Sequence, residues 1–222
     1  MTGSVVGQLI LKDWRLHRLP VVLSVAGGAA ALVVAQLGGP TPFIVGGAWF
    51  FIALIIFGSL LPSLSIVNER KKQNLAFLMS LPISSIQYTT AKLLSILGMF
   101  LAPWLMLVIS ALLLIQERGF LPHGTIPLTL ILATLPLVGF CFIAGGAFIS
   151  EGWGIAATVV CNSSYWLVWY VLMQTQGVTD GLKSRVAIWS PTVLTILGGE
   201  FALAALILGL TFYLQSRKRD FV

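Results

Sequence analysis

Six long apolar stretches constrain the fold of this 222-residue chain more than any motif in it. About 20 helical residues are needed to cross the hydrocarbon core of a bilayer. Of 13 basic and 7 acidic residues, only Glu200 falls inside the stretches, although a charge at the centre of a spanning helix costs about 2.5–3.5 kcal/mol on insertion scales. The stretches are continuous and do not alternate in polarity, which predicts spanning helices and not a barrel. The predicted spans are residues 20–37, 43–67, 93–115, 126–149, 155–173 and 192–214.

The composition agrees with a protein that lives in the bilayer. Hydrophobic residues make up 58% of the chain and charged residues 9%, whereas a soluble domain carries about 25% charged residues. These values exclude a disordered chain, a soluble enzyme and a nucleic-acid-binding domain. We therefore expect an all-α integral membrane protein whose residues 1–222 form a single transmembrane domain.

The placement of the basic residues predicts how the helices are oriented. If the N-terminus is cytoplasmic, ten basic residues fall on the inner side and only Arg118, Lys183 and Arg185 on the outer side. Cytoplasmic loops carry an excess of lysine and arginine. The sequence thus predicts a multi-pass protein of the bacterial cell membrane with both termini in the cytoplasm, and it explains the net charge of +6 without a nucleic acid.

Residues 1–19 are patterned before the first span begins. Val6, Leu9 and Trp14 recur at helical spacing, and Lys12 and Arg15 share another face. Such a pattern predicts an amphipathic helix on the inner membrane surface, with Trp14 at the level of the headgroups. The alternative is a cleaved signal peptide, since cations followed by an apolar run also fit that reading.

The connection between the second and third spans, residues 68–92, is the longest cytoplasmic segment. A charged cluster precedes apolar residues at helical spacing, and a proline ends the pattern because the residue before it is pushed out of the α region. The apolar face of this short helix must lie on lipid or dock on a partner. The residues that form the pattern are Glu69, Arg70, Lys71, Leu75, Leu78, Met79, Leu81 and Pro82.

This segment resembles the loop between helices two and three of type-2 ATP-binding-cassette (ABC) permeases. The resemblance rests on Glu69-Arg70-Lys71, on the run from Phe77 through Pro82 to Ser84, and on Gln87-Tyr88 and Lys92. The six spans, the N-terminal amphipathic helix and the cytoplasmic termini are also similar to that family, so the resemblance covers the whole chain.

The resemblance implies specific partners. In this family, residues 68–92 would contain a coupling helix that docks on a separate ATPase subunit, and residues 1–19 would form an elbow helix along the membrane. Two permease chains, either two copies or this chain and a sister permease, would assemble with two ATPases. The stretch 174–191 would dip back into the outer leaflet.

No G-x-x-x-x-G-K-[ST] phosphate-binding loop occurs in the sequence, although such a loop is what cradles ATP phosphates in P-loop ATPases. We therefore expect no cofactor in this chain, with ATP and magnesium bound by the partner subunit.

Few other residues point to chemistry. Glu200 is the one carboxylate within a span, and it can contact substrate, gate the pathway or begin the last helix after Gly198-Gly199, where it would favour the positive helix end. His17 and His123 are interpreted as isolated from carboxylates and cysteines, so we expect no catalytic or metal site. Cys141 and Cys161 are interpreted as small buried hydrophobic residues. Glu151, in the inner turn between two spans, can make a minor ATPase contact or simply be solvated.

The functional hypothesis is a permease subunit that exports a hydrophobic or amphipathic substrate such as a peptide, drug or lipid. It is not itself an enzyme. The alternatives are a self-standing membrane transporter or immunity protein without an ATPase, and a membrane-embedded enzyme. The first would need ion-coupling carboxylates, and the second a cluster of polar residues near one interface.

Overall fold

Apolar helices account for nearly all of the computed structural model, which describes residues 2–37, 39–67, 85–118, 122–182 and 184–217. No strand occurs among these residues. Within these ranges, six helices are long and apolar enough to cross a membrane, which confirms the predicted all-helical fold with six candidate spans. In chain order the elements are α1 (Thr2–Ala35), α2 (Pro40–Pro62), η1 (Ser63–Val67), α5 (Ser85–Arg118), α6 (Thr125–Ile149), α7 (Glu151–Gln174), α8 (Gln176–Thr179) and α9 (Pro191–Arg217).

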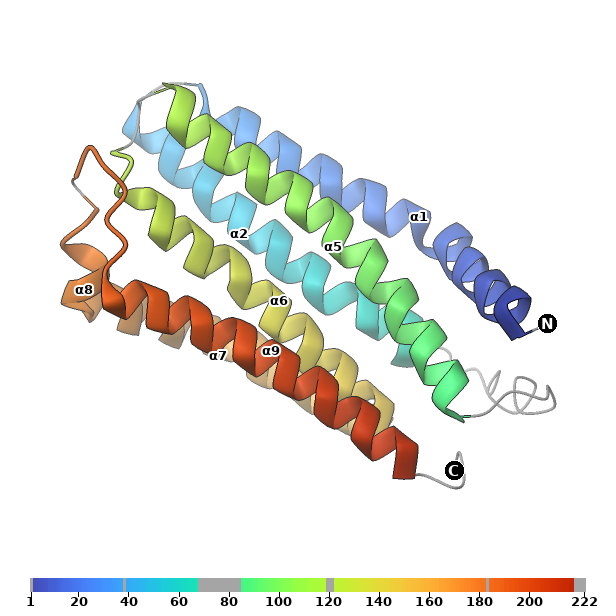
Figure 1. Cartoon of the computed structure of the whole chain (residues 1–222). Helices are drawn as coiled ribbons and strands as arrows, with labels where there is room; N and C mark the ends of the chain where they lie inside the picture. The colour runs from blue at the N-terminus through green and yellow to red at the C-terminus, as the bar shows by residue number, and fades with distance from the viewer. Residues whose placement is uncertain (1, 38, 68–84, 119–121, 183, 218–222) are drawn as a thin grey trace.

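The long helices lie side by side, and the start of α1 and the end of α9 lie at the same end of the bundle (Figure 1). The end of η1, the start of α5 and the turn between α6 and α7 are at that end too. The turn between α1 and α2, and α8, lie at the other end. We refer to the first as the terminal end and the second as the α8 end.

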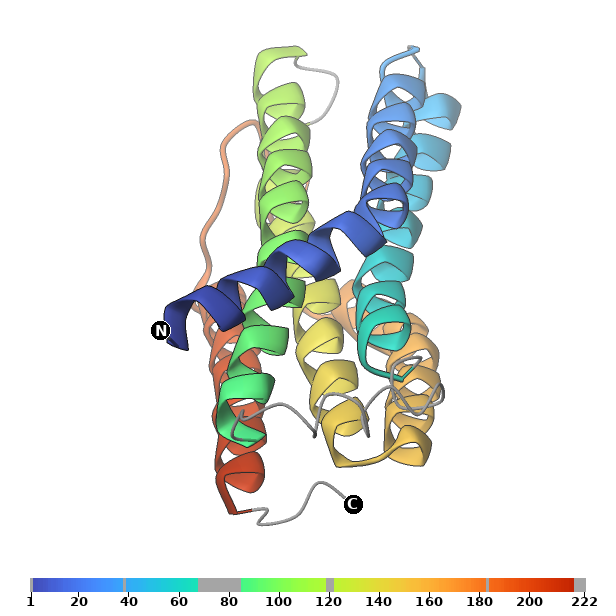
Figure 2. The same ribbon diagram turned by 90° about the vertical axis from the view of Figure 1, so that its right-hand side faces the viewer.

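The N-terminal helix differs from its predicted form. The sequence predicted an amphipathic helix over 1–19 that is separate from the span 20–37, whereas α1 runs through both without a break and contains Pro20. The missing backbone donor of a proline is tolerated in membrane helices when local adjustments satisfy the freed carbonyl. Figure 2 shows that the N-terminal part of α1 crosses the bundle at an angle to the part that follows.

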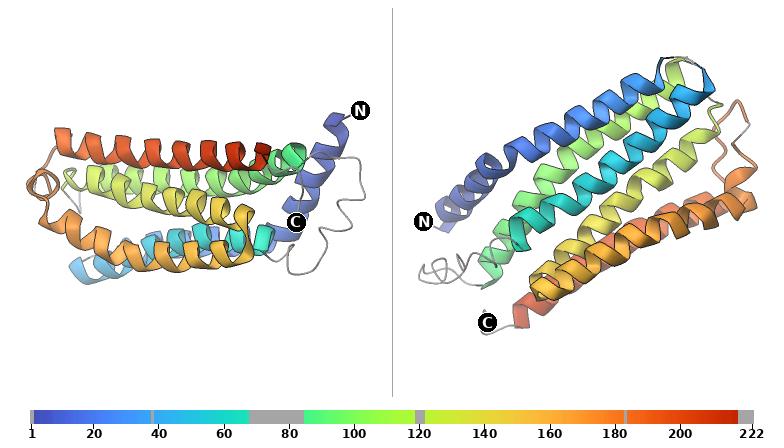
Figure 3. Two further views of the ribbon diagram at one scale, coloured as in Figure 1. Left: turned by 90° about the horizontal axis from the view of Figure 1, so that it is seen from below. Right: turned by 180° about the vertical axis from the view of Figure 1, so that it is seen from behind.

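Helix α6 forms the centre of the bundle. It packs against α2, α7 and α9, and Figure 3 shows α7 and α9 on its two sides. Within the most apolar 18-residue segment of each helix, 61% of the residues are buried in α6, against 11% in each of α7 and α9. Much of the surface of α7 and α9 is therefore left for lipid or for another protein chain.

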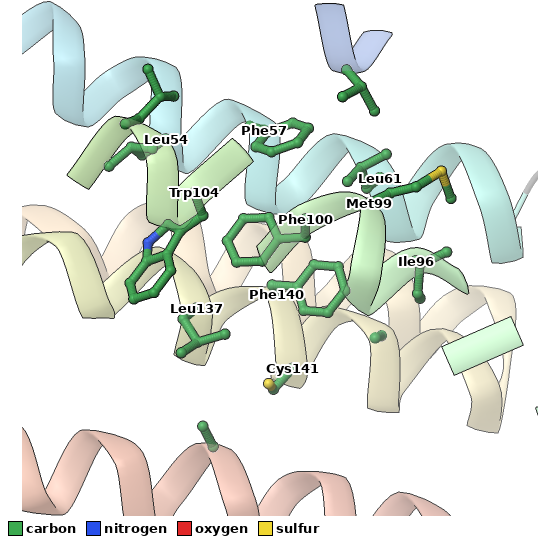
Figure 4. Close-up of a cluster of buried hydrophobic side chains, with 14 of the residues drawn as sticks. Leu54, Phe57, Leu61, Ile96, Met99, Phe100, Trp104, Leu137, Phe140 and Cys141 are labelled. Carbon is green, nitrogen blue, oxygen red and sulfur yellow. The ribbon is translucent and has the colours of Figure 1, made fainter. Parts of the chain in front are cut away.

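Stacked aromatic side chains join three helices in the core (Figure 4). The ring of Phe100, on α5, stacks on Phe140 of α6 at 4.7 Å between centroids and lies 5.4 Å from Phe57 of α2. The indole of Trp104, one turn further along α5, donates a hydrogen bond to the carbonyl of Ala133 at 2.7 Å. Such pairs contribute roughly 0.5–1.5 kcal/mol beyond the area that they bury.

Helices α1 and α2 come close together at a glycine, as is common where helices approach in membranes. A Cβ atom added to Gly46 would lie 2.7 Å from the carbonyl oxygen of Ala31 and would also overlap the backbone of Ala35. The neighbouring Gly47 has open space at the same point.

We predict that Gly46→Ala lowers the thermal stability of the purified protein, because its methyl group would meet backbone that cannot move aside. Gly47→Ala is the matched control and should leave the melting temperature unchanged or raise it, since alanine is the better helix former by about 1 kcal/mol. Equal melting temperatures for the two variants would contradict the close approach of α1 and α2.

Candidate functional site

The predicted ATPase-contacting residues lie outside the described residues. All of them fall within the undescribed segment 68–84: Glu69, Arg70, Lys71, Leu75, Leu78, Met79, Leu81 and Pro82. The structure places the residues on either side, because η1 ends at Val67 and α5 begins at Ser85, both at the terminal end. Glu151, the first residue of α7, is at the same end.

A buried ion pair joins the N-terminal helix to the start of α5. The ammonium Nζ of Lys92 lies 2.9 Å from Oδ2 and 3.0 Å from Oδ1 of Asp13. The side chains are only 4% and 5% exposed. Sequence reasoning missed this contact, because 79 positions separate the two residues. A signal was present, however, since Asp13 is the only acidic residue in the cationic N-terminal segment.

His17 lies one helical turn beyond Asp13 and is buried on the same side of α1. Its Nδ1 is 2.9 Å from the backbone carbonyl of Asp13, to which it donates a hydrogen bond in the tautomer that carries the proton there. The acceptor is a backbone carbonyl, so this hydrogen bond does not join His17 to a carboxylate. Before Pro20, α1 buries the polar residues Asp13 and His17, whereas Lys12, Trp14 and Arg15 are exposed.

The buried pair is chemically suited to fix the position of one helix against another. Transferring two charges out of water is costly, so a buried pair often adds little net stability compared with apolar residues of similar volume. Removing one partner is different, because it leaves an uncompensated buried charge and costs about 3–5 kcal/mol. Asp13 is on α1 and Lys92 is on α5. Their contact holds the N-terminal part of α1 at one place on the bundle.

A second polar region lies where the last turn of α2 meets the middle of α7. The hydroxyl of Ser59 donates to Ile55 O at 2.9 Å and is 3.3 Å from Oδ1 of Asn162. Asn162 is at the middle of α7 and is exposed. Among the described residues its amide nitrogen has no hydrogen-bond partner. An amide facing hydrocarbon without a partner is costly, so a polar partner from another chain would be favourable at this face.

Next to this contact, a groove of about 290 Å³ lies between η1 and the first half of α7. The groove is bounded by η1, a π-helical turn, and such turns are frequent at functional sites. Its walls are mainly apolar with hydroxyl groups among them, which suits an amphipathic ligand. The lining residues are Ser63, Leu64, Val67, Gly154, Ile155, Thr158 and Val159.

Glu200 lies between α9 and α6. Its Oε2 accepts a hydrogen bond from the hydroxyl of Thr134, a buried residue of α6. The predicted alternative in which Glu200 begins the last helix is wrong, because α9 begins nine residues earlier at Pro191. The hydroxyl of Ser190 accepts from the backbone N–H of Val193 and caps that helix start instead. Contact of Glu200 with substrate or a gate stays a prediction.

The stretch 174–191 contains the short helix α8, which contacts both α7 and α9. Val178 of α8 is buried against Ile131 and Val193, and the hydroxyl of Ser190 donates to the carbonyl of Gly177 at 2.6 Å. These contacts attach α8 to α6, α7 and α9 at the α8 end of the bundle.

The described residues contain no group of three or more histidine, cysteine or acidic side chains that could hold a metal ion. Cys141 is a fully buried free thiol and Cys161 a half-buried one. No family model matches the chain, and comparison with curated proteins and with solved structures found no significant match.

We predict that Thr134→Val lowers the free energy of unfolding by about 1 kcal/mol, because hydrogen bonds between membrane helices contribute about 0.6 kcal/mol on average and about 1.7 at most. Chemical denaturation in detergent measures the difference. Thr129→Val, on the same helix, is the control, since the hydroxyl of Thr129 bonds only within α6, to the carbonyl of Thr125. An equal loss in both variants would contradict a link between α6 and α9 through Glu200.

Proposed function

We propose that this chain is the membrane-spanning subunit of a type-2 ABC exporter, powered by ATP that a separate subunit hydrolyses. The residues of the predicted coupling helix, 69–82, would bind the ATPase. Two permease chains would enclose the pathway for a hydrophobic or amphipathic substrate.

One observation carries the proposal: the end of η1 at Val67 and the start of α5 at Ser85, which flank the predicted coupling segment, lie at the same end of the bundle as the start of α1 and the end of α9 (Figure 1). The predicted orientation puts this end of the bundle on the cytoplasmic side. A cytoplasmic ATPase could therefore reach this end and not the α8 end. From the coupling segment, movement would pass directly into η1 and α5. η1 lines the groove, and α5 carries Lys92 of the buried ion pair.

The exposed polar face of α7 supports a second permease chain. A carboxamide contains both donors and an acceptor. Around a two-fold axis, Asn162 of one chain can therefore satisfy the same residue of its copy. The groove beside it would then open toward the interface between the two chains, where an amphipathic substrate could be held between apolar walls and hydroxyl groups.

In the proposed cycle, ATP binding closes the two ATPases on each other and pulls the two coupling segments together. The end of η1 and the start of α5 follow, and the groove between η1 and α7 changes its access from one side of the membrane to the other. Apolar walls favour substrates that partition into the bilayer.

The first test disrupts the proposed docking face. We predict that Leu78→Asp abolishes co-purification with an ABC ATPase encoded beside this gene and expressed with it, because a charge would replace an apolar contact. The measurement is the amount of ATPase recovered with the tagged permease from detergent-solubilised membranes.

Asn74→Asp adds the same charge to the same segment and serves as the control, since Asn74 is not part of the apolar pattern. It should retain the ATPase. Full recovery with Leu78→Asp, while the permease is inserted at normal levels, would contradict the coupling role.

The second test concerns the face of α7. With Cys141 and Cys161 replaced by alanine, we predict that Asn162→Cys forms a disulfide-linked dimer on oxidation in membranes. The control is Val160→Cys, because Val160 is 57% exposed but points to the other side of α7. Non-reducing electrophoresis measures the dimer. If Val160→Cys cross-links and Asn162→Cys does not, the proposed interface is wrong.

A further inference from the structure

The N-terminal part of α1 is attached to the bundle by a contact that differs from those in the rest of the core. Most buried side chains are apolar, yet the contact of Asp13 with Lys92 is ionic and reaches both carboxylate oxygens. His17 extends the same polar side of α1 by one turn. An ionic contact is specific in position, because a shift of one residue along either helix would leave both charges buried and unpaired.

The contact lies on the N-terminal side of Pro20. A proline inside a helix removes one backbone hydrogen bond and favours a kink there. The part of α1 before Pro20 crosses the bundle at an angle to the part after it (Figure 2). The ion pair thus holds the part of α1 before Pro20 on the start of α5, while the part after Pro20 packs on α2 and, at Gly28, on Leu107 further along α5.

Lys92 belongs to the third turn of α5, the helix that follows the predicted coupling segment. Beside it on the buried face are Thr89 and Ser95, which are 2% and 3% exposed. Among the described residues, the hydroxyl of Ser95 has no hydrogen-bond partner. The buried face of this part of α5 therefore carries polar side chains beside apolar ones, since Leu93 and Ile96 belong to the same core cluster as Phe100.

We propose that Lys92 and Asp13 are positioning residues that make the N-terminal part of α1 move as one unit with the start of α5, with Pro20 as the hinge. This inference rests on the proposed function. In it, movement of the coupling segment reaches the first span through the ion pair. The pair acts as a tether, and the tether exists whether or not an ATPase is bound.

Spin labels test the tether. In a protein with Cys141 and Cys161 replaced by alanine, one label is placed on Leu16 of α1 or Leu94 of α5, which are 62% and 53% exposed. The second label is placed on Trp153, a 63% exposed residue in the first turn of α7. Electron–electron double resonance then reports the distance from each helix to the bundle.

In the permease alone, we expect a single narrow Leu16–Trp153 distance that becomes broad in Lys92→Met, while Lys92→Arg retains the narrow distance. Arg15→Met, which removes an exposed cation from the same helix, should not change it. Asp13→Asn tests the tether from the side of α1 if Lys92→Met fails to fold. A narrow distance in the variants that remove either charge would overturn the inference.

In the complex with the ATPase, addition of a non-hydrolysable ATP analogue should shift both distances together. In Lys92→Met, only the Leu94–Trp153 distance should shift. A joint shift that persists in Lys92→Met would overturn the tether. If no nucleotide shift occurs in any variant while the broadening in the permease alone is present, the tether stands and the proposed ABC function fails.

Discussion

The bilayer is the constraint on which the rest of this structure depends. Because hydrocarbon offers no hydrogen-bond partners, each spanning segment must satisfy its own backbone, and helices do so within one segment. The six apolar helices follow from that requirement. It also restricts where polar groups can stand, so each buried or mid-membrane polar side chain indicates a contact that the apolar helices alone would not provide.

The polar contacts divide the bundle into parts with different roles. At the terminal end, Asp13 and Lys92 fix the N-terminal part of α1 on α5. In the middle, stacked rings around Phe100 hold α2, α5 and α6 together, and Thr134 connects α6 to Glu200 of α9. On the exposed face of α7, the amide nitrogen of Asn162 has no hydrogen-bond partner among the described residues. In the proposed transporter, that is where a second permease chain would bind.

Much of the fold could be predicted from the sequence, since apolar runs and the near absence of charge within them report directly on the bilayer. The side-chain contacts could not be predicted in the same way. Periodicity gives the faces of single helices, whereas the pairing of Asp13 with Lys92 depends on which helices become neighbours. The apolar run that begins at Pro20 predicts the start of a span there, but α1 continues through Pro20 because membrane helices tolerate proline. The coupling residues lie outside the described chain, so their role rests on sequence resemblance.

The central claim is that six crossings leave the coupling segment and both termini on the cytoplasmic side. Single cysteines at Gln176 and Arg217, both exposed and at opposite ends of the bundle, test it most directly when Cys141 and Cys161 are replaced by alanine. A membrane-impermeant maleimide should label the cysteine at Gln176 in intact cells and the one at Arg217 only after permeabilisation. The reverse pattern, or labelling of both from one side, would contradict the account.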